Sequence, residues 1–467
     1  MSDLVEQLRA AIGPEAVRTE PEALAAHRRD TWVLSELRDL EGARFAKPAV
    51  VVEPADAQQV AAVLRLARLT KTPVVPFGGG SGVCGGVLPP EGAIVLATRR
   101  MDGLVALDDR DLKATFRAGT NGLAAERRVS EAGLTIGHWP QSIELSTVGG
   151  WVATRAAGQY STAYGSIEDV LLALEAVLPD GTIVRTRETP RAAAGPDLRQ
   201  VFLGSEGTLG VVTEVTFSLR AKPDESRGRA FHFATFGAGL EAIRLVMRAG
   251  WRPPVVRLYD AHESKRTFGE YTPEGRHLLL LLHEGPEPAV EAEIAGVTQI
   301  CDAAGGAETG VGAVDHWLEH RNRVPGFRGF LEKGIVLDTI EVAATWSRVG
   351  ALYEGVVASL RQVPDLLAAS AHSSHSYRSG TNLYFTFAVR PKDRAKMGEI
   401  YEDCWRRTME ATLAAGGGVA HHHGIGRVRR AALAGELGAG GVALLRTLKR
   451  ALDPDNLLNP GVLLPDA

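Results

Sequence analysis

The sequence predicts an α+β protein made of two regions that differ in composition. The first region opens with an apolar strand at residues 49–52, a helix that begins at Pro54-Ala55-Asp56, and a strand at Val74-Val75. This alternation of strand and helix is typical of a mixed layer. Clusters of glycine mark the first region and stop near Arg220. The polar residues 223–230 follow, and we expect them to link the first region to the second.

Local patterns predict the remaining elements. Residues 2–12 form a helix, because their apolar side chains recur at helical spacing. The turn Pro179-Asp180-Gly181-Thr182 separates strands at 171–178 and 183–184 and predicts a hairpin. In the first region we also expect strands at 94–96, 105–107, 115–118 and 211–219 and a helix at 122–132. In the second region we expect helices at 237–249 and 393–415, strands at 277–282 and 383–389, and turns over 452–461.

The composition excludes several classes of protein. The chain has 467 residues, of which 45% are hydrophobic and 23% charged, as in ordinary globular proteins. The net charge of -4 predicts no nucleic-acid partner, and three cysteines predict no disulfide framework. No stretch reaches the ~18 apolar residues of a membrane span, and neither end resembles a targeting signal. We expect a soluble cytoplasmic protein and leave open a peripheral contact with the inner face of the membrane.

The glycine loop at residues 76–86 is the first candidate site. Gly80, Gly82 and Gly85 match the spacing G-x-G-x-x-G of dinucleotide-binding folds. That motif requires a helix directly after the loop, but residues 87–92 contain two prolines and a glycine. We therefore reject a Rossmann site. The loop can still bind a phosphate through converging backbone N–H groups, and a plain surface loop is the alternative.

Two further segments support a bound ligand. Residues 140–158 and 204–214 are rich in small and hydroxyl-bearing side chains. Such segments let the backbone approach a large flat ligand and supply hydrogen-bond donors to its edges.

The order of these three segments resembles the FAD-binding domain of the vanillyl-alcohol oxidase superfamily, from about residue 30 to the end of the chain. Within that superfamily, the sequence is most similar to the alkylglycerone-phosphate synthases. The run Ser146-Thr147-Val148-Gly149-Gly150-Trp151 is typical of that family, whereas residues 204–210, Gly-Ser-Glu-Gly-Thr-Leu-Gly, are shared across the superfamily.

The resemblance implies an α+β fold in which a two-subdomain, PCMH-type FAD-binding domain is joined to a cap domain with an antiparallel sheet flanked by helices. We place an N-terminal helical segment at 1–45, the FAD-binding domain at 46–222, the cap or substrate domain at 223–450, and a C-terminal segment that returns to the FAD domain at 451–467.

The resemblance also implies which residues bind FAD. They are Pro76, Phe77, Gly78, Gly79, Gly80, Ser81, Gly82, Gln141, Ser142, Ile143, Glu144, Leu145, Ser146, Thr147, Thr154, Arg155, Ala156, Ala157, Glu206, Gly207, Thr208, Leu209, Gly210, Val211 and Val212. The family binds FAD without a covalent link. The loop from Pro76 to Pro90 contains no histidine that could attach the flavin, so we expect non-covalent FAD here.

A histidine run, His421-His422-His423, follows three glycines in the second region. Neighbouring residues of an extended backbone face opposite sides, so three in a row seldom bind one metal, and we predict no metal site. Imidazoles can instead contact phosphate or move protons, although histidines in a polar loop are often simply solvated. The synthase family carries a His-His-His-Gly run as an active-site element, which favours a catalytic role.

Tyr384 lies in a strand pattern, Leu383-Tyr384-Phe385-Thr386-Phe387. The pattern alone fits a tyrosine of the core or of an interface. The family's general acid/base tyrosine lies in a similar strand, and Tyr384 matches it. A phenol transfers a proton near neutral pH only if its pKa is lowered, and we expect the histidine run to lower it.

Two arginines complete the implied site. Arg257 interrupts an apolar strand, so it is either an edge residue with a solvated head or a paired functional group. It matches an arginine that the family needs for activity. Arg328 matches the family's substrate-binding arginine across a one-residue gap, and its planar fork suits a phosphate.

The implied reaction exchanges the acyl group of an acyl-dihydroxyacetone phosphate for a long-chain alcohol, as in ether lipid synthesis, with a phosphorylated lipid-like substrate and a homodimer as expected partners. In the family, the flavin is thought to act without net redox change. The alternative is an FAD-dependent 2-hydroxy-acid dehydrogenase of the D-lactate or D-2-hydroxyglutarate type. The metal ligands of those enzymes would fall on Tyr377, Tyr384, His422 and His423. Only His423 is kept, which favours the synthase.

Overall fold

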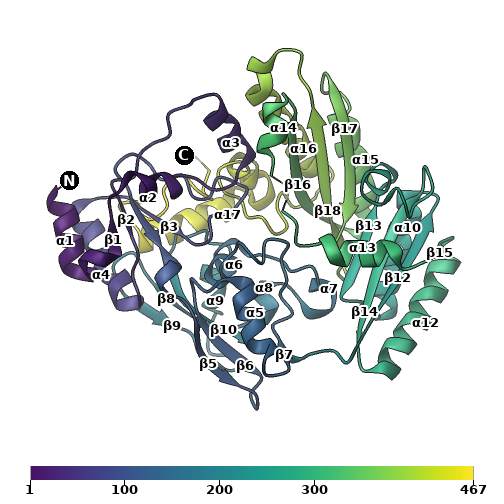
Figure 1. The fold of residues 1–467 in the computed structure, drawn as a ribbon, viewed down its shortest axis with the longest axis horizontal. Helices are drawn as coiled ribbons and strands as arrows, with labels where there is room; N and C mark the ends of the chain where they lie inside the picture. The colour runs from purple at the N-terminus through teal and green to yellow at the C-terminus, as the bar shows by residue number, and fades with distance from the viewer. Residues whose placement is uncertain (1, 325, 466–467) are drawn as a thin grey trace.

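The computed structural model describes residues 2–324 and 326–465 and shows an α+β protein organised around three main sheets (Figure 1). The first is a four-stranded sheet in the order β1-β2-β4-β3, in which β2, β4 and β3 are parallel. Its core is formed with helices α1 and α4. The elements of this subdomain are α1 (Ser2–Ile12), β1 (Val17–Arg18), α2 (Pro21–Ala26), β2 (Val50–Val52), α4 (Ala57–Thr70), β3 (Val74–Phe77) and β4 (Ile94–Ala97), with short 3-10 helices at Pro14–Ala16 and Thr98–Arg100.

The second sheet is antiparallel, in the order β5-β6-β10-β8-β9. The predicted hairpin is confirmed, because β8 and β9 pair on either side of the turn at residues 178–182. The elements here are β5 (Leu104–Asp108), β6 (Lys113–Arg117), α5 (Gly122–Ser130), β7 (Leu134–Thr135), α6 (Val148–Thr154), α7 (Ser161–Tyr164), α8 (Ile167–Val170), β8 (Leu171–Val177), β9 (Ile183–Arg185), α9 (Arg199–Phe202), β10 (Val211–Ser218) and β11 (Arg220–Ala221), which pairs with β7.

The third sheet has seven antiparallel strands in the order β15-β12-β14-β13-β17-β18-β16. Helices α10, α12, α15 and α16 contribute to the core beneath it. The elements are β12 (Glu225–Phe233), α10 (Phe236–Ala249), β13 (Val255–Tyr259), α11 (Ala261–Phe268), β14 (His277–Gly285), α12 (Glu287–Ala303), β15 (Ala307–Thr309), α13 (Gly312–His320), α14 (Arg328–Glu332), β16 (Val336–Thr345), α15 (Trp346–Leu360), β17 (Leu366–Ser373), β18 (Gly380–Val389), a 3-10 helix at Arg394–Lys396, and α16 (Met397–Ala414).

The predicted linker at 223–230 is wrong. Residues Glu225–Phe233 form β12, which pairs along its whole length with β14. The strand reads as polar because its outer part alternates charged and small residues, and only Ala230, Phe231 and Phe233 are buried. A half-buried strand of this kind resembles a loop in composition.

The N-terminal segment connects the first and third sheets. Helix α3 (Val33–Leu40) buries Val33, Leu34 and Leu37 in the same apolar core as the seven-stranded sheet. Helix α1, by contrast, packs on the four-stranded sheet. The segment is thus mostly helical, as predicted, and it also supplies β1 to a sheet.

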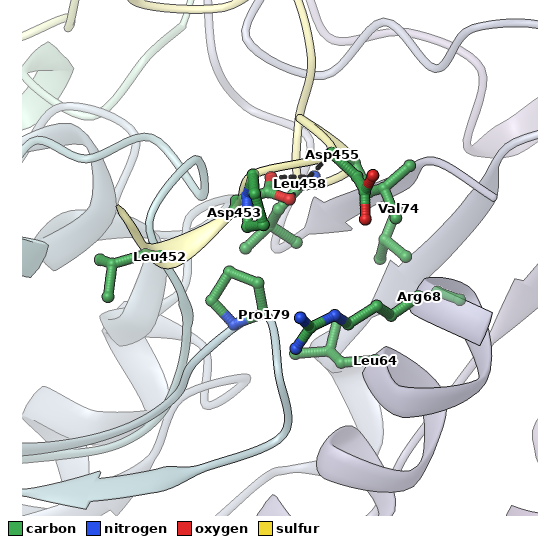
Figure 2. A pocket seen from close by; sticks show the side chains of 11 residues that line it. Leu64, Arg68, Val74, Pro179, Leu452, Asp453, Asp455 and Leu458 are labelled. Carbon is green, nitrogen blue, oxygen red and sulfur yellow. Dashed lines mark hydrogen bonds between the residues drawn. The ribbon is translucent and has the colours of Figure 1, made fainter. Parts of the chain in front are cut away.

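The C-terminal segment lies along β3. The amide of Val74 donates to the carbonyl of Leu457, and the amide of Asn459 donates to the carbonyl of Val74, both at 2.8 Å. Figure 2 shows a small cavity at this junction, between α4, β3, Pro179 and the segment that contains Asp453 and Leu458. Its volume of about 20 Å³ suits one water molecule and not a flavin.

The expectation that no segment is long and apolar enough to span a bilayer is wrong for one helix among the described residues. Helix α17 (Arg430–Leu452) qualifies by length and composition, and only 11% of its most apolar window is buried. Gly438 has a non-helical backbone, with φ 67 and ψ 173, which divides α17 into two shorter helical parts. Each part is shorter than the ~20 residues of a membrane span.

Candidate active site

The predicted cofactor segments converge in the structure. Loop 76–82 packs directly on segment 141–147, because a Cβ on Gly79 would lie 2.1 Å from the carbonyl oxygen of Leu145. Residues 204–212 join them: the amide of Gly204 donates to Val152, the amide of Glu206 donates to Ala153, and Gly207 lies against Pro76. Only glycine allows two backbone segments to pack this closely, because any Cβ would clash with the neighbouring segment. The sequence is glycine-rich here for this reason.

The arrangement fits FAD. Among the described residues, nothing accepts a hydrogen bond from the amide groups of Gly79, Gly80, Ser81 and Gly82. Unpaired amides in a glycine-rich loop form a receptor for an anion such as a pyrophosphate. The buried Ser205 hydroxyl also has no partner and lies in the 204–212 segment. These groups would hold FAD when it is bound.

Several side chains that were predicted to bind the cofactor instead pack in the core, cap a helix or form an ion pair. Ile143 is fully buried in the core of the second sheet, and Leu209 and Val211 are also buried. The Thr147 side chain caps α6 by accepting from the amide of Gly150, and the exposed Arg155 lies 3.3 Å from Glu168. These residues serve the site through their backbone or through the packing of the loops.

Glu206 connects the FAD-binding domain to the histidine loop. Its carboxylate accepts hydrogen bonds from the amides of Ile425 and Gly426, at 2.6 and 2.8 Å. Burial raises the pKa of Glu206 to about 7, and these two amide donors oppose the rise. Asn459 donates to the carbonyls of Glu206 and Gly86, so the C-terminal segment ties the same loops together.

Tyr384 lies on β18 at the meeting point of three strands. Its register partners are His372 on β17 and Glu341 on β16. The phenol ring stacks on the rings of His372 and His422, with centroids 4.9 and 5.9 Å away. The neighbours Leu383 and Phe385 are buried in the core, so strand alternation turns Tyr384 toward the histidine loop.

Glu341 anchors the histidine run and was not predicted from the sequence. Its side chain is fully buried and forms an ion pair with the equally buried Arg429. It also accepts from the backbone amides of His421, His422 and His423, at 3.4, 3.3 and 2.9 Å. Burial opposes its charge, but Arg429 and His423 hold the pKa of Glu341 well below its usual range.

His375, His421 and His422 are neutral near pH 7. Burial lowers the pKa of His421 to about 4, and it lowers the pKa values of His422 and His375 well below the ordinary value. His421 Nε2 lies 2.7 Å from the Tyr377 hydroxyl, and its Nδ1 lies 2.8 Å from His422 Nδ1. The contact with His421 uses His422 Nδ1, and His422 Nε2 makes no hydrogen bond with the described residues.

The predicted lowering of the Tyr384 pKa is wrong. Burial raises the pKa of Tyr384, and the nearby Glu341 raises it further, although Thr339 donates a hydrogen bond to the phenol at 3.1 Å. The histidine run cannot oppose this rise, since the two imidazoles His421 and His422 are uncharged near pH 7. Tyr384 thus holds its proton at neutral pH.

Arg257 joins the cluster, and Arg328 does not. The Arg257 guanidinium donates to the Tyr259 hydroxyl at 2.7 Å and lies 3.0 Å from His372 Nε2. Arg328 lies on α14 with 48% of its side chain exposed, and its guanidinium is bound to Glu36 and Asp39 of α3. The predicted substrate role of Arg328 is therefore not supported, because carboxylates already fill its fork.

One contact and one cluster that involve His375 were missed by sequence reasoning. His375 Nδ1 lies 2.6 Å from the Ser161 hydroxyl on α7, which joins the cap sheet to the FAD-binding domain. One ring nitrogen each of His375, His421 and His422 lies within 4.8 Å of the others, a spacing that a metal ion could use. The only sequence signal for His375 is its place just before β18.

Family models match most of the chain. The FAD binding domain matches residues 48–187, and the C-terminal domain of FAD linked oxidases matches residues 222–463. The chain is 32% identical to an Escherichia coli O157:H7 protein called uncharacterized FAD-linked oxidoreductase YgcU, over 99% of this chain and 98% of that protein. It is 30% identical to the alkyldihydroxyacetonephosphate synthase of Trypanosoma brucei brucei, over 99% and 80%.

A solved structure of an alkyldihydroxyacetonephosphate synthase has the same fold, with a TM-score of 0.82, 24% identity, and coverage of 98% of this chain and 84% of that one. Both family matches identify the cofactor as FAD. The unpaired amides of the glycine loop and the joined loops around Glu206 fit the same cofactor. The chain belongs to the FAD-linked oxidases.

Proposed function

We propose that this protein is an alkylglycerone-phosphate synthase-like enzyme. It would exchange the acyl group of an acyl-dihydroxyacetone phosphate for a long-chain alcohol and release a fatty acid. The observation that carries the proposal is the protonated phenol of Tyr384 stacked on the neutral imidazole of His422. A proton donor and a proton acceptor side by side suit a reaction that removes and returns a proton at one carbon.

His422 is the group best placed to accept a proton. Its Nδ1 is engaged with His421, while its Nε2 is available and carries no charge near pH 7. We assign the acceptance of the C1 proton of dihydroxyacetone to this nitrogen, and the donation of a proton back to C1 to the hydroxyl of Tyr384. The proton held by His422 then passes to the phenolate of Tyr384, so both groups end the cycle in the protonation states in which they began. Bound FAD would supply an electrophilic ring to the reaction.

Glu341 and Arg429 keep the acceptor in place. Because Glu341 binds all three backbone amides of the histidine run and also pairs with Arg429, the backbone of the run is fixed to a buried ion pair. Fixed donors and acceptors of this kind need little reorganisation during a reaction.

The alternative, a metal-assisted 2-hydroxy-acid dehydrogenase, is less well supported. The positions of its ligands hold Tyr377 and Tyr384, whose pKa values are raised by burial, to about 12 for Tyr377. Both phenols are also engaged, with His421 and Thr339. Protonated phenols are poor metal ligands compared with imidazole.

The test is to incubate FAD-loaded protein with acyl-dihydroxyacetone phosphate and labelled hexadecanol. The proposal expects a labelled alkyl product and one fatty acid released for each alcohol incorporated. A parallel sample receives D-lactate or D-2-hydroxyglutarate without oxygen. Bleaching of the flavin in that sample, with no alkyl product in the first, would replace the proposal with the dehydrogenase.

A further inference from the structure

A tryptophan of the N-terminal segment joins the glycine loop to the cap domain. Trp32 is the N-cap residue of α3, and its side chain is buried. Its indole packs on the glycine loop, because a Cβ on Gly85 would lie 2.6 Å from the ring carbon Cε3. The indole Nε1–H donates a hydrogen bond to the hydroxyl of Tyr401 on α16, at 2.8 Å. Helix α3 itself lies beside α16 (Figure 1).

The two residues before Trp32 bind the same loop. The buried carboxylate of Asp30 accepts hydrogen bonds from the amides of Gly86 and Trp32, at 2.8 and 3.3 Å. Thr31 donates both its backbone amide and its hydroxyl to the carbonyl of Gly82, at 2.9 and 2.8 Å. The backbone that carries the indole is therefore attached to the glycine loop at two points.

A buried carboxylate continues the connection in the cap domain. Asp338 on β16 accepts from the hydroxyl of Tyr401 at 2.7 Å and from the indole of Trp405 at 3.0 Å. Because Tyr401 gives its hydroxyl hydrogen to this carboxylate, its oxygen is left to accept from Trp32. Asp338 and Tyr401 are both buried, and hydrogen bonds in such a low-dielectric network are strong and hold one geometry.

Thr339 carries the connection across the sheet to Tyr384. Asp338 and Thr339 are neighbours on β16, so their side chains face opposite sides of the sheet. The backbone amide of Thr339 donates to the Asp338 carboxylate at 2.8 Å, and its hydroxyl donates to the phenol oxygen of Tyr384 at 3.1 Å. Since the phenol oxygen accepts from Thr339, its own hydrogen points away from Thr339 and can be given to another group.

We propose that Trp32, Tyr401 and Thr339 are positioning residues that couple the glycine loop to the phenol of Tyr384. The position of the glycine loop would then set the orientation in which Tyr384 donates its proton. The inference rests on the proposed function for the reaction that the phenol serves. The N-terminal segment, which precedes the family matches at 48–187 and 222–463, becomes part of the catalytic machinery.

The test follows the phenol of Tyr384 in the FAD-loaded protein. Tyrosine labelled with ¹³C at Cζ gives a separate resonance for each ring, and the chain has eight tyrosines. The resonance of Tyr384 is the one that Tyr384→Phe removes. The same samples are incubated with palmitoyl-dihydroxyacetone phosphate in heavy water, and the rate of deuterium entry at C1 is measured. The Kd of FAD is measured by flavin fluorescence.

The first variant is Trp32→Phe, which keeps an aromatic ring on Gly85 and removes the N–H donor. We expect it to move the Tyr384 resonance and to slow deuterium entry about ten-fold at unchanged KM, because a small displacement of a catalytic group lowers the rate steeply. The matched control is Trp251→Phe, which changes an indole that packs in the same way on Gly296 of α12. It should leave the resonance in place and the rate within about two-fold.

The second pair of variants acts at the other end of the connection. Thr339→Val keeps the shape of the side chain and removes the hydroxyl, so it should move the Tyr384 resonance and slow deuterium entry about ten-fold. Thr339→Ser restores the donor and should return the rate to within about three-fold of wild type. An unchanged resonance and rate in Thr339→Val would overturn the inference, even if Trp32→Phe lost FAD or failed to fold.

Failure of the inference and failure of the proposed function give different results. If wild-type protein admits no deuterium at C1, but the Tyr384 resonance moves in Trp32→Phe and Thr339→Val, the coupling stands and the synthase proposal fails. If wild-type protein exchanges the C1 proton, and Trp32→Phe changes neither the resonance nor the rate, the coupling is overturned and the synthase proposal stands.

Discussion

The substitution Glu341→Gln tests how the histidine run is held. It keeps the size of the side chain and removes its charge. In the wild type, Glu341 and Arg429 are both fully buried, and Arg429 Nη1 donates to the carboxylate at 2.6 Å. The variant leaves the Arg429 cation buried without its counter-ion and weakens the three amide contacts that fix His421 to His423.

Breaking a buried ion pair by neutralising one partner costs about 3–5 kcal/mol. The entropy of unfolding is about 2.1 cal/mol/K per residue, which is about 1 kcal/mol/K for a chain of this length. The midpoint Tm should therefore fall by about 3–5 °C. Turnover should fall by about ten-fold or more, because the acceptor nitrogen of His422 loses its fixed position.

The assay is differential scanning calorimetry of the FAD-loaded protein, together with the steady-state rate. Glu332→Gln is the control, since this exposed carboxylate is paired with Arg328 on the surface, and its Tm should change by less than about 1 °C. The double variant Glu341→Gln, Arg429→Met should recover part of the Tm loss, because no unpaired charge remains. A Tm within about 1 °C of wild type for Glu341→Gln would refute the reasoning.

Four further outcomes are expected. Tyr384→Phe should keep FAD and the fold but lose about 100-fold in turnover, and near-normal turnover would make Tyr384 a packing residue. Acid precipitation should release all the yellow colour to the supernatant, whereas colour in the pellet would show covalent FAD. Dialysis against a chelator should leave turnover unchanged, and a loss restored by zinc would assign a metal to His375, His421 and His422. Because burial raises the pKa of Glu206 from 4.5 to about 7, the folded state binds its proton more tightly, and stability falls as pH rises through this window. Glu206→Gln should therefore lose less Tm than wild type between pH 5 and pH 8, and parallel losses would contradict this.

The sequence determined the local elements and the cofactor loops. The strands β8, β10 and β18 and the helices α4, α5 and α10 follow from periodicity and turn residues that act over a few positions. The glycine loop and the 204–212 segment could also be predicted as cofactor loops, because backbone segments that approach closely require small residues. The position of Tyr384 on its strand follows from alternation alone.

Only the tertiary structure decided which charged groups meet. Glu341 and His372 carry no local signal, and their places beside Tyr384 come from the strand order β17-β18-β16. The same limit applies to Arg328, because no sequence pattern reveals its ion pairs with Glu36 and Asp39 of α3. Burial, too, is a tertiary property. It raises the pKa of Tyr384 directly, and it lowers the pKa values of His421 and His422, so these two imidazoles carry no charge that could oppose the rise.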